Sequence, residues 1–257
     1  MRRSLEQPIR CVDSPRGFDA VTTVLGIDTA TSHVSIAIAV DGVILGESSL
    51  PADRRHAEVL TPALTLLFAE AGLRPKNLDA IGVGIGPGLF TGLRVGVTTA
   101  MTMGHALGVP VLPVSTLDIL AIPHARDGRV VASVLDARRK EVFCATYRTG
   151  VLDHGDPVIE RLTDDEVGSA QEFLDRLLQL GERVLVVGGG AGVYAEVFAG
   201  HDSIEVAGPE YSIPSGGVLV LRASRDLENG LGQLADSVRP RYLRKSDAEL
   251  NWNKVGK

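Results

Sequence analysis

One stretch, from Leu78 to Ser115, restricts the fold of this chain more than any other. It opens with an apolar run, Ala80–Ile85, that is typical of a buried strand. A glycine-proline loop follows, and then a segment from Thr91 to about Leu107 whose pattern predicts a helix ending at Gly108. A second short apolar run ends at Val114. Strand, tight glycine turn, helix and strand in this order predict a βαβ crossover in an open α/β sheet.

The helix in this stretch carries a row of small residues at every fourth position: Gly92, Gly96, Ala100, Gly104 and Gly108. Positions four apart share one helix face, and a glycine in a helix interior costs about 1 kcal/mol relative to alanine. A row of small side chains lets another backbone approach closely. Two alternatives follow: the row packs on the chain's own sheet, or it faces a helix that can belong to another subunit.

A second amphipathic segment, 54–71, predicts the first long helix. Its apolar stripe is broad, and Pro62 predicts either a kink or a late start near Thr61. The helix has more apolar surface than one sheet face needs, which is a second indication of a helix–helix contact. We therefore expect a partner interface made of Leu60, Leu64, Leu67, Gly92, Gly96, Val97, Ala100, Met101 and Gly104.

The folded chain is predicted to begin at Val24, with a short strand that ends in Asp28 and a hydroxyl-rich turn. The strands that follow, 34–40 and 43–48, are joined by Asp41-Gly42, a strong hairpin signal. Asp28, Thr29 and Thr31 are suited to present backbone N–H groups and hydroxyls to a phosphate. The same residues are equally suited to satisfy local backbone groups in a plain turn.

A second hairpin is predicted about a hundred residues later, from strands at 129–135 and 141–147 with a charged turn at 136–140. The repetition indicates two related α/β halves. A short helix is expected at 116–122, and helices are also predicted at 169–180, 192–198 and 216–227, with a buried strand at 183–187.

Composition excludes several classes of protein. The net charge of −6 argues against a free-standing nucleic-acid binder, and no apolar run approaches the length of a membrane span. Cys11 and Cys144 are far apart, which favours reduced thiols in a cytosolic protein. The six histidines include no pair at metal-binding helical spacing, and no G-x-S-x-G elbow, Walker lysine or G-x-G-x-x-G register occurs.

Six motifs, taken in order, resemble the TsaB (YeaZ) family, which supports threonylcarbamoyladenosine synthesis on tRNA in bacteria. They lie at 26–31, 55–58, 86–96, 114–117, 135–142 and 240–244, and the run Gly86-Pro87-Gly88-Leu89-Phe90-Thr91-Gly92-Leu93-Arg94-Val95-Gly96 is the most specific of them. The resemblance covers about Val24 to Arg244. It implies the two-lobed actin/Hsp70/sugar-kinase-like (ASKHA) fold.

The catalytic paralogue of that family, TsaD, differs from this chain at two places. Where TsaD-like chains have two metal-binding histidines, this chain has Thr116 and Leu120, and leucine cannot ligate a metal. Where they have a glycine-rich phosphate turn, it has Asp136-Ala137-Arg138-Arg139-Lys140, whose side chains obstruct a close backbone approach. The resemblance therefore implies a non-catalytic, cytoplasmic partner with no metal or cofactor, in which Asp28, Thr29 and Thr31 form a vestigial phosphate turn.

By this resemblance the chain pairs with TsaD, joins a TsaE-type ATPase in a larger complex, contacts tRNA only through that complex, and forms a homodimer when alone. Arg138, Arg139 and Lys140 are the candidates for a tRNA contact. Two alternatives stay open: an active TsaD-type transferase that uses a metal and a nucleotide, and a small-molecule kinase of the same superfamily. The expected organisation is a disordered extension (1–23), a first lobe (24–115) onto which the helix at about 216–230 returns, a second lobe (116–215) and a tail (231–257).

Overall fold

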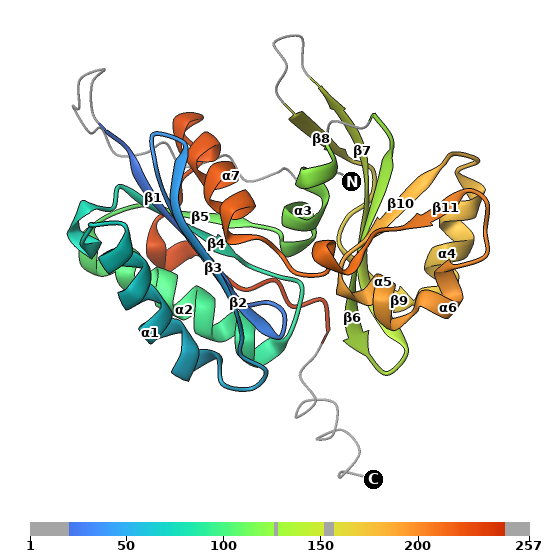
Figure 1. Cartoon of the computed structure of the whole chain (residues 1–257), viewed down its shortest axis with the longest axis horizontal. Helices are drawn as coiled ribbons and strands as arrows, with labels where there is room; N and C mark the ends of the chain where they lie inside the picture. The colour runs from blue at the N-terminus through green and yellow to red at the C-terminus, as the bar shows by residue number, and fades with distance from the viewer. Residues whose placement is uncertain (1–20, 126–127, 152–156, 245–257) are drawn as a thin grey trace, which may run out of the picture. The chain divides into compact units, whose positions relative to one another are not determined.

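The computed structural model describes residues 21–125, 128–151 and 157–244. Most of the expected N-terminal extension and the end of the expected tail, from Lys245 on, lie outside these ranges. The chain divides into two compact units (Figure 1). Of the described residues, the first contains 21–85, Arg94–Val114 and Ser215–Arg239, and the second contains Gly86–Leu93, the described part of Ser115–Pro214, and 240–244. The chain therefore passes repeatedly from one unit to the other.

A five-stranded sheet with the order β3-β2-β1-β4-β5 forms the first unit. Its strands are β1 (Thr23–Asp28), β2 (His33–Val40), β3 (Val43–Pro51), β4 (Ala80–Gly84) and β5 (Val111–Val114). Strand β1 pairs antiparallel with β2 and parallel with β4, and β4 pairs parallel with β5. Because the helix after β4 leads into the parallel strand β5, the predicted βαβ crossover is confirmed.

Helices cover both faces of this sheet. On one face lie α1 (His56–Glu70) and α2 (Phe90–Leu107), over a core that includes Ile36 and Leu67. On the other face α7 (Gly216–Glu228) packs against β1, β2 and β4. The alternative of a late start for the first helix is wrong, because α1 begins at His56 with Pro62 inside it.

Small residues bring α7 close to its sheet. A Cβ added at Gly82 would lie 2.5 Å from the Cβ of Ala223, so only glycine fits at that point of β4. The helix begins where Ser215 caps it, with the Ser215 Oγ accepting from the N–H of Val218 at 3.1 Å. The Glu47 carboxylate accepts from the N–H of Gly217 at 2.9 Å, which adds a favourable negative charge at the positive end of the helix.

The second unit repeats the strand order of the first. Its strands are β6 (Val130–Arg138), β7 (Glu141–Val151), β8 (Pro157–Arg161), β9 (Glu166–Ser169), β10 (Val184–Val187) and β11 (Ile204–Val206). Strands β8-β7-β6-β10-β11 follow one another in the sheet as β3-β2-β1-β4-β5 do, and β9 pairs with β7. The pairs β6–β7 and β6–β10 are again antiparallel and parallel. The predicted relation between the two halves is therefore confirmed.

The helices of the second unit are α3 (Thr116–Ala121), α4 (Ala170–Gln179), α5 (Gly189–Val193) and α6 (Ala195–Phe198). Helix α4 begins at a capping box, in which the Ser169 Oγ accepts from the Glu172 N–H at 3.1 Å. Its apolar stripe, with Phe173 and Leu177, joins one core cluster, whereas Leu117 and Leu120 of α3 join another. Short 3₁₀ helices lie at Pro75–Asn77, Ile122–His124, Pro209–Tyr211 and Ala235–Ser237.

Two hairpins of the chain use very different residues at their tips. The β2–β3 turn has Asp41 and Gly42, both with positive φ (49° and 73°), as a two-residue type I′ turn requires. The β6–β7 turn has Arg139 and Lys140 at its tip, preceded by Arg138, and all three have positive φ (56°, 65° and 65°). Residues with a Cβ adopt this conformation only at a cost in backbone energy.

The structure differs from the predicted elements in three ways. Strands β8, β9 and β11 were not predicted, since runs of three to five residues are too short for alternation to be recognised. The helix expected at 192–198 is two short helices, because Tyr194 leaves helical geometry at φ −111° and ψ 32°. Strand β6 continues beyond the expected residue 135 to Arg138. None of the helices that the structure describes has the length and apolar character needed to cross a membrane.

Candidate functional site

The turn after β1, expected to be a vestigial phosphate turn, is filled by the protein's own side chains. Asp28 and Thr29 are 1 % and 0 % exposed. The Asp28 Oδ1 accepts from the N–H of Ala30 at 3.0 Å. A Cβ added at Gly84 would clash with the Asp28 carboxylate, and one added at Gly96 would clash with the Thr29 hydroxyl. The two glycines therefore serve to enclose these side chains.

Thr31 belongs to the same turn but makes different contacts. Its hydroxyl accepts from the N–H of His33 at 3.3 Å, and its carbonyl lies 2.7 Å from the buried Nε2 of His56. Because His56 is the first residue of α1, this bond joins the turn to the helix. The turn thus satisfies local backbone groups, which was the second of the two alternatives that the sequence left open.

The residues expected at a partner interface lie mostly in the core of the first unit. Leu60, Leu64, Leu67, Val97 and Ala100 all belong to its main hydrophobic cluster, and Met101 is partly buried against it. Gly92, Gly96 and Gly104 are buried as well.

A Cβ at Gly104 would lie 2.7 Å from a methyl group of Val111 in β5 and 3.2 Å from the Cβ of Ala235. The small-residue row therefore faces the chain's own sheet, and the choice of these residues as a partner-facing surface is wrong. The reason is that a helix lying on a sheet can use close approach just as a helix between subunits can, and spacing alone does not tell the two apart.

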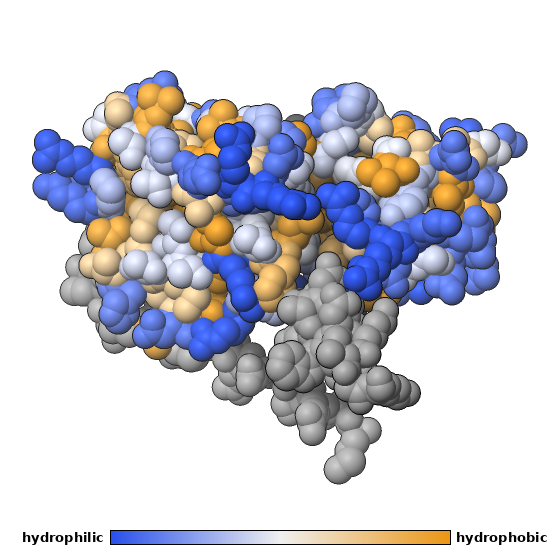
Figure 2. Space-filling view, turned by 90° about the horizontal axis from the view of Figure 1, so that it is seen from below, coloured by the Kyte–Doolittle hydropathy of each residue, from blue (hydrophilic) through white to orange (hydrophobic). Residues whose placement is uncertain are grey.

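The opposite sides of the two helices are exposed. We call them the outward face, which consists of Thr65, Leu66 and Ala69 of α1 and Thr98, Thr102 and Ala106 of α2. Leu66 is 59 % exposed, and Glu58, Glu70 and Arg94 are exposed on the same two helices. Figure 2 looks onto these helices and shows apolar residues interspersed with hydrophilic ones.

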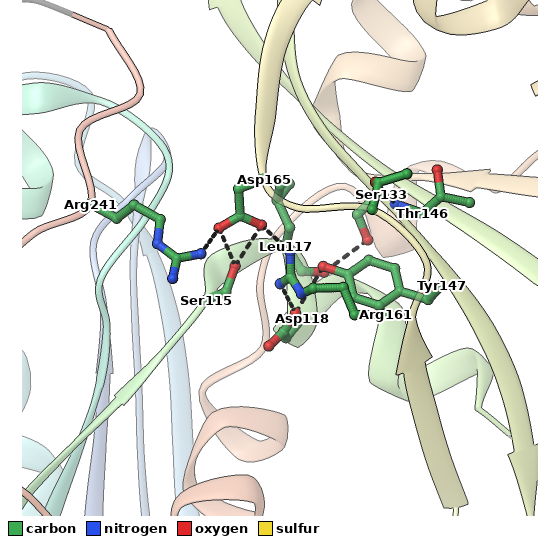
Figure 3. A network of polar contacts seen from close by, with 10 residues as sticks. Ser115, Leu117, Asp118, Ser133, Thr146, Tyr147, Arg161, Asp165 and Arg241 are labelled. Atoms are coloured by element: carbon green, nitrogen blue, oxygen red, sulfur yellow. Dashed lines mark hydrogen bonds and ion pairs between the residues drawn. The ribbon is translucent and has the colours of Figure 1, made fainter. Parts of the chain in front are cut away.

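In the second unit a network of charged side chains is centred on Asp165, whose side chain is 1 % exposed (Figure 3). Its carboxylate forms ion pairs with Arg161 and with Arg241, and accepts from the Ser115 hydroxyl. Arg161 also pairs with Asp118. The network therefore joins the start of α3, the end of β8 and the C-terminal segment.

Tyr147 extends this network into the core. Its hydroxyl donates to Asp118 at 2.8 Å, and the Arg161 guanidinium lies 5.0 Å from the centre of its ring. Burial, and after it the nearby Asp118 carboxylate, raises the pKa of Tyr147 above its ordinary value. The phenol stays protonated and acts as a hydrogen-bond donor. This arrangement holds side chains in place and contains no exposed nucleophile.

The two positions that the resemblance matched to metal-binding histidines are buried in the second unit. Thr116 and Leu120 are 0 % and 3 % exposed, and Leu120 packs in the core cluster of α3. Among the residues that the structure describes, no group of three or more His, Cys, Asp or Glu side chains is placed to hold a metal ion.

A pocket of about 160 Å³ lies at the β6–β7 turn of the second unit. Its walls are the turn itself, the loop from Gly88 to Phe90, and the segment from Arg241 to Arg244. Arg244 fixes one wall to another, since its guanidinium donates to the carbonyl of Ala137 at 2.8 Å and lies 3.3 Å from a carboxylate oxygen of Glu141. On another side the rings of Phe90 and Tyr242 are 4.8 Å apart and tilted by 35°.

Asp136 shapes the turn at this pocket. Its Oδ1 accepts from the N–H of Arg138 at 2.7 Å, and its other oxygen pairs with the Arg138 guanidinium at 3.1 Å. The Tyr194 hydroxyl donates to the same carboxylate at 3.1 Å, and burial together with the Asp136 charge raises the pKa of Tyr194. Of the three predicted tRNA-contact residues, Arg138 and Arg139 line the pocket, and Lys140 is exposed beside them.

Sequence reasoning missed the aromatic wall of this pocket and the Asp165 network. Tyr242 and Phe90 lie within two of the motifs described above, but nothing in the sequence places them together. Asp165 sits in the polar run Thr163-Asp164-Asp165-Glu166, which is typical of an exposed loop rather than a buried carboxylate.

Comparison with known proteins identifies relatives over most of the chain. Residues 50–252 match the family model of TsaD, described as tRNA N6-adenosine threonylcarbamoyltransferase. The tRNA threonylcarbamoyladenosine biosynthesis protein TsaB of Bacillus subtilis is 27 % identical over 90 % of this chain and 97 % of its own length. An uncharacterized protein of Mycobacterium tuberculosis is 44 % identical over 58 % of this chain and 70 % of its own length.

A solved structure, YeaZ from Pseudomonas aeruginosa, has a TM-score of 0.71 at 28 % identity and covers 86 % of this chain and 100 % of its own. These similarities confirm the predicted resemblance to TsaB (YeaZ) and the two-lobed actin/Hsp70/sugar-kinase-like fold.

Proposed function

Because this chain belongs to the TsaD family, whose model is described as tRNA N6-adenosine threonylcarbamoyltransferase, we propose that it takes part in threonylcarbamoyladenosine synthesis on tRNA as an accessory subunit. In this role it pairs with a TsaD-type transferase and supports it, and carries no catalytic residue of its own. The similarity to TsaB proteins over nine-tenths of the chain supports the pathway.

The observation that carries the accessory role is the pair Thr116 and Leu120. Both are buried within the second unit, at the positions where the catalytic paralogue needs two imidazole ligands. An isobutyl side chain offers no lone pair to a metal. The turn at 136–140 supports the same conclusion, because three side chains with a Cβ stand where a phosphate turn needs glycine.

The outward face of α1 and α2 is the surface that we propose for pairing. Leu66 would bury its exposed side chain, and the small neighbours Ala69, Thr98 and Ala106 would let helices of the partner approach closely. When no transferase is present, the same face would pair two copies of this chain about a two-fold axis. A TsaE-type ATPase joins the larger complex, and the whole functions in the cytoplasm.

Co-purification tests the pairing. A tagged copy of this chain should retain the TsaD-type transferase of the same cell, and tRNA threonylcarbamoylation should require both proteins. Leu66→Arg should abolish retention while leaving the circular dichroism spectrum unchanged. Leu221→Arg is the matched control, because Leu221 is an exposed leucine (41 %) on α7, across the sheet.

Turnover separates this proposal from the alternatives. Threonylcarbamoylation by the chain alone would show an active transferase, and phosphorylation of a small molecule would show a kinase. Equal retention of the transferase by Leu66→Arg and Leu221→Arg would show that pairing does not use the outward face.

A further inference from the structure

The pocket at the β6–β7 turn gathers positive charge in an acidic protein. The chain carries a net charge of −6, yet four arginines and a single aspartate line this pocket. Two of these arginines, Arg241 and Arg244, are paired with Asp165 and Glu141. The Arg138 side chain is 71 % exposed, so its pairing with Asp136 leaves much of the guanidinium accessible. Arginine guanidinium groups bind phosphate oxygens well because their N–H donors are arranged in a planar fork.

The backbone of the turn supports a role in binding. Three consecutive residues with a Cβ, Arg138 to Lys140, are held in the left-handed region. The β2–β3 hairpin also needs two residues with positive φ at its tip, and it uses Asp41 and Gly42, which adopt this conformation with less strain. Local strain of this kind is concentrated at functional sites. At the β6–β7 turn the strained positions are those that carry the cations.

An aromatic surface stands beside these cations. Tyr242 is 42 % exposed, and its ring lies against that of Phe90 on the wall of the pocket. Exposed aromatic rings next to a basic groove are the means by which proteins hold single-stranded nucleic acids, with a base stacked on the ring and phosphates on the cations. A hydrophilic region over the outer end of the β6–β7 hairpin is visible in Figure 2.

The size of the pocket decides between a free nucleotide and a strand. A volume of about 160 Å³ is below the roughly 300–1,000 Å³ of sites that enclose a small molecule. One base, or one phosphate with its sugar, fits within it, and the neighbouring nucleotides would then lie over the exposed hairpin.

We propose that this pocket and the exposed hairpin beside it bind single-stranded RNA, with one base in the pocket against Tyr242 and the neighbouring phosphates at Arg138 and Arg139. The choice of RNA rests on the proposed function in tRNA modification. The cations and the ring hold the strand without reading its sequence, since the contacts are to phosphate and to the face of a base.

Fluorescence anisotropy on the purified full-length chain tests this proposal, with a labelled single-stranded RNA of about seven nucleotides as the probe. We expect Tyr242→Ala to weaken binding by about tenfold and Tyr242→Phe to retain it, because stacking needs only the ring. Changing both Arg138 and Arg139 to glutamine should weaken binding and reduce the slope of log affinity against log salt by about 0.7 for each phosphate that is no longer neutralised.

The control is Arg183→Gln, which removes an exposed arginine of the same unit outside the pocket. An equal loss of affinity in this control would overturn the proposal, because binding would then follow charge alone. Binding of adenosine monophosphate as tight as that of the RNA would also overturn it. Co-purification of the arginine variants with the transferase is measured separately. Normal pairing without RNA binding refutes only this inference, whereas RNA binding without pairing refutes only the proposed function.

Discussion

Replacing Arg139 with asparagine and Lys140 with glycine should make the protein more stable. Both residues have a positive φ (56° and 65°) at the tip of the β6–β7 hairpin. A left-handed residue with a Cβ costs roughly 1–2 kcal/mol, whereas asparagine and glycine are the residues that a type I′ turn favours. The glycine reduces this gain by roughly 0.5–1 kcal/mol, because it makes the unfolded chain more flexible.

The expected net gain in the free energy of unfolding is about 1 kcal/mol, or about 2–4 °C in melting temperature for a chain of this size. Urea unfolding followed by circular dichroism measures it. The variant with alanine at both positions is the matched control, because it removes the same two charges and leaves a Cβ at each left-handed position.

The difference between the two variants therefore reports the backbone strain, less the roughly 0.5–1 kcal/mol that glycine costs through the unfolded chain. If the Asn-Gly variant is no more stable than the Ala-Ala variant, the turn holds no strain and its backbone does not indicate a binding role. Both variants should bind single-stranded RNA less tightly than the unchanged chain, because each lacks two cations.

Four further outcomes follow from the packing. Gly96→Ala should destabilise the fold by about 1–3 kcal/mol in urea unfolding, because the added methyl group meets the Thr29 hydroxyl. Gly192→Ala is the control and should not destabilise the fold, because Gly192 has open space around it. Burial raises the pKa of Cys144 to about 12, so in a Cys11→Ser background this thiol should react with a thiol reagent at pH 8 only after unfolding. The same shift should make stability fall from about pH 9, where the unfolded thiol ionises, towards pH 12, and Cys144→Ala should flatten that part of a pH–stability curve. Asp165→Ala should lower the unfolding free energy by up to roughly 3 kcal/mol, because Arg161 and Arg241 both lose their buried partner, and an unchanged urea midpoint would mean that water screens the pairs.

The parts of the fold that follow from local patterns were predictable. The β4–α2–β5 crossover needs only an apolar run, a glycine turn and a terminating glycine, and each is visible in the sequence. The Asp41-Gly42 hairpin is read in the same way, because a two-residue turn of this kind satisfies its own backbone. The short strands β8, β9 and β11 depend on neighbours that are distant in the chain.

The side-chain arrangements were less predictable, for two physical reasons. The small-residue row of α2 indicates that another backbone lies close to it, but not whether that backbone belongs to the chain's own sheet or to a partner. The prediction that Gly104 faces a partner was therefore wrong. The network around Asp165 brings together residues as distant in the sequence as Ser115 and Arg241. Only the folded chain shows that the negative charge of Asp165 is paired with the positive charges of Arg161 and Arg241. The turn at 136–140 was predicted, but its left-handed backbone at Arg138–Lys140 was not, because arginine and lysine are not residues that favour positive φ.

The alternation of the chain between its two units affects the order in which the protein can fold on the ribosome. The sheet of the first unit is complete once Val114 has been made, but the helix that covers one of its faces, α7, begins at Gly216. About a hundred residues of the second unit are synthesised in between, which takes roughly 5–20 s at about 5–20 residues per second. During that interval Val24, Ala37 and Leu112, buried beneath α7 in the finished protein, have no helix over them. The nascent chain therefore carries an uncovered apolar sheet face for seconds, which makes it a natural client for a chaperone that binds exposed apolar surface.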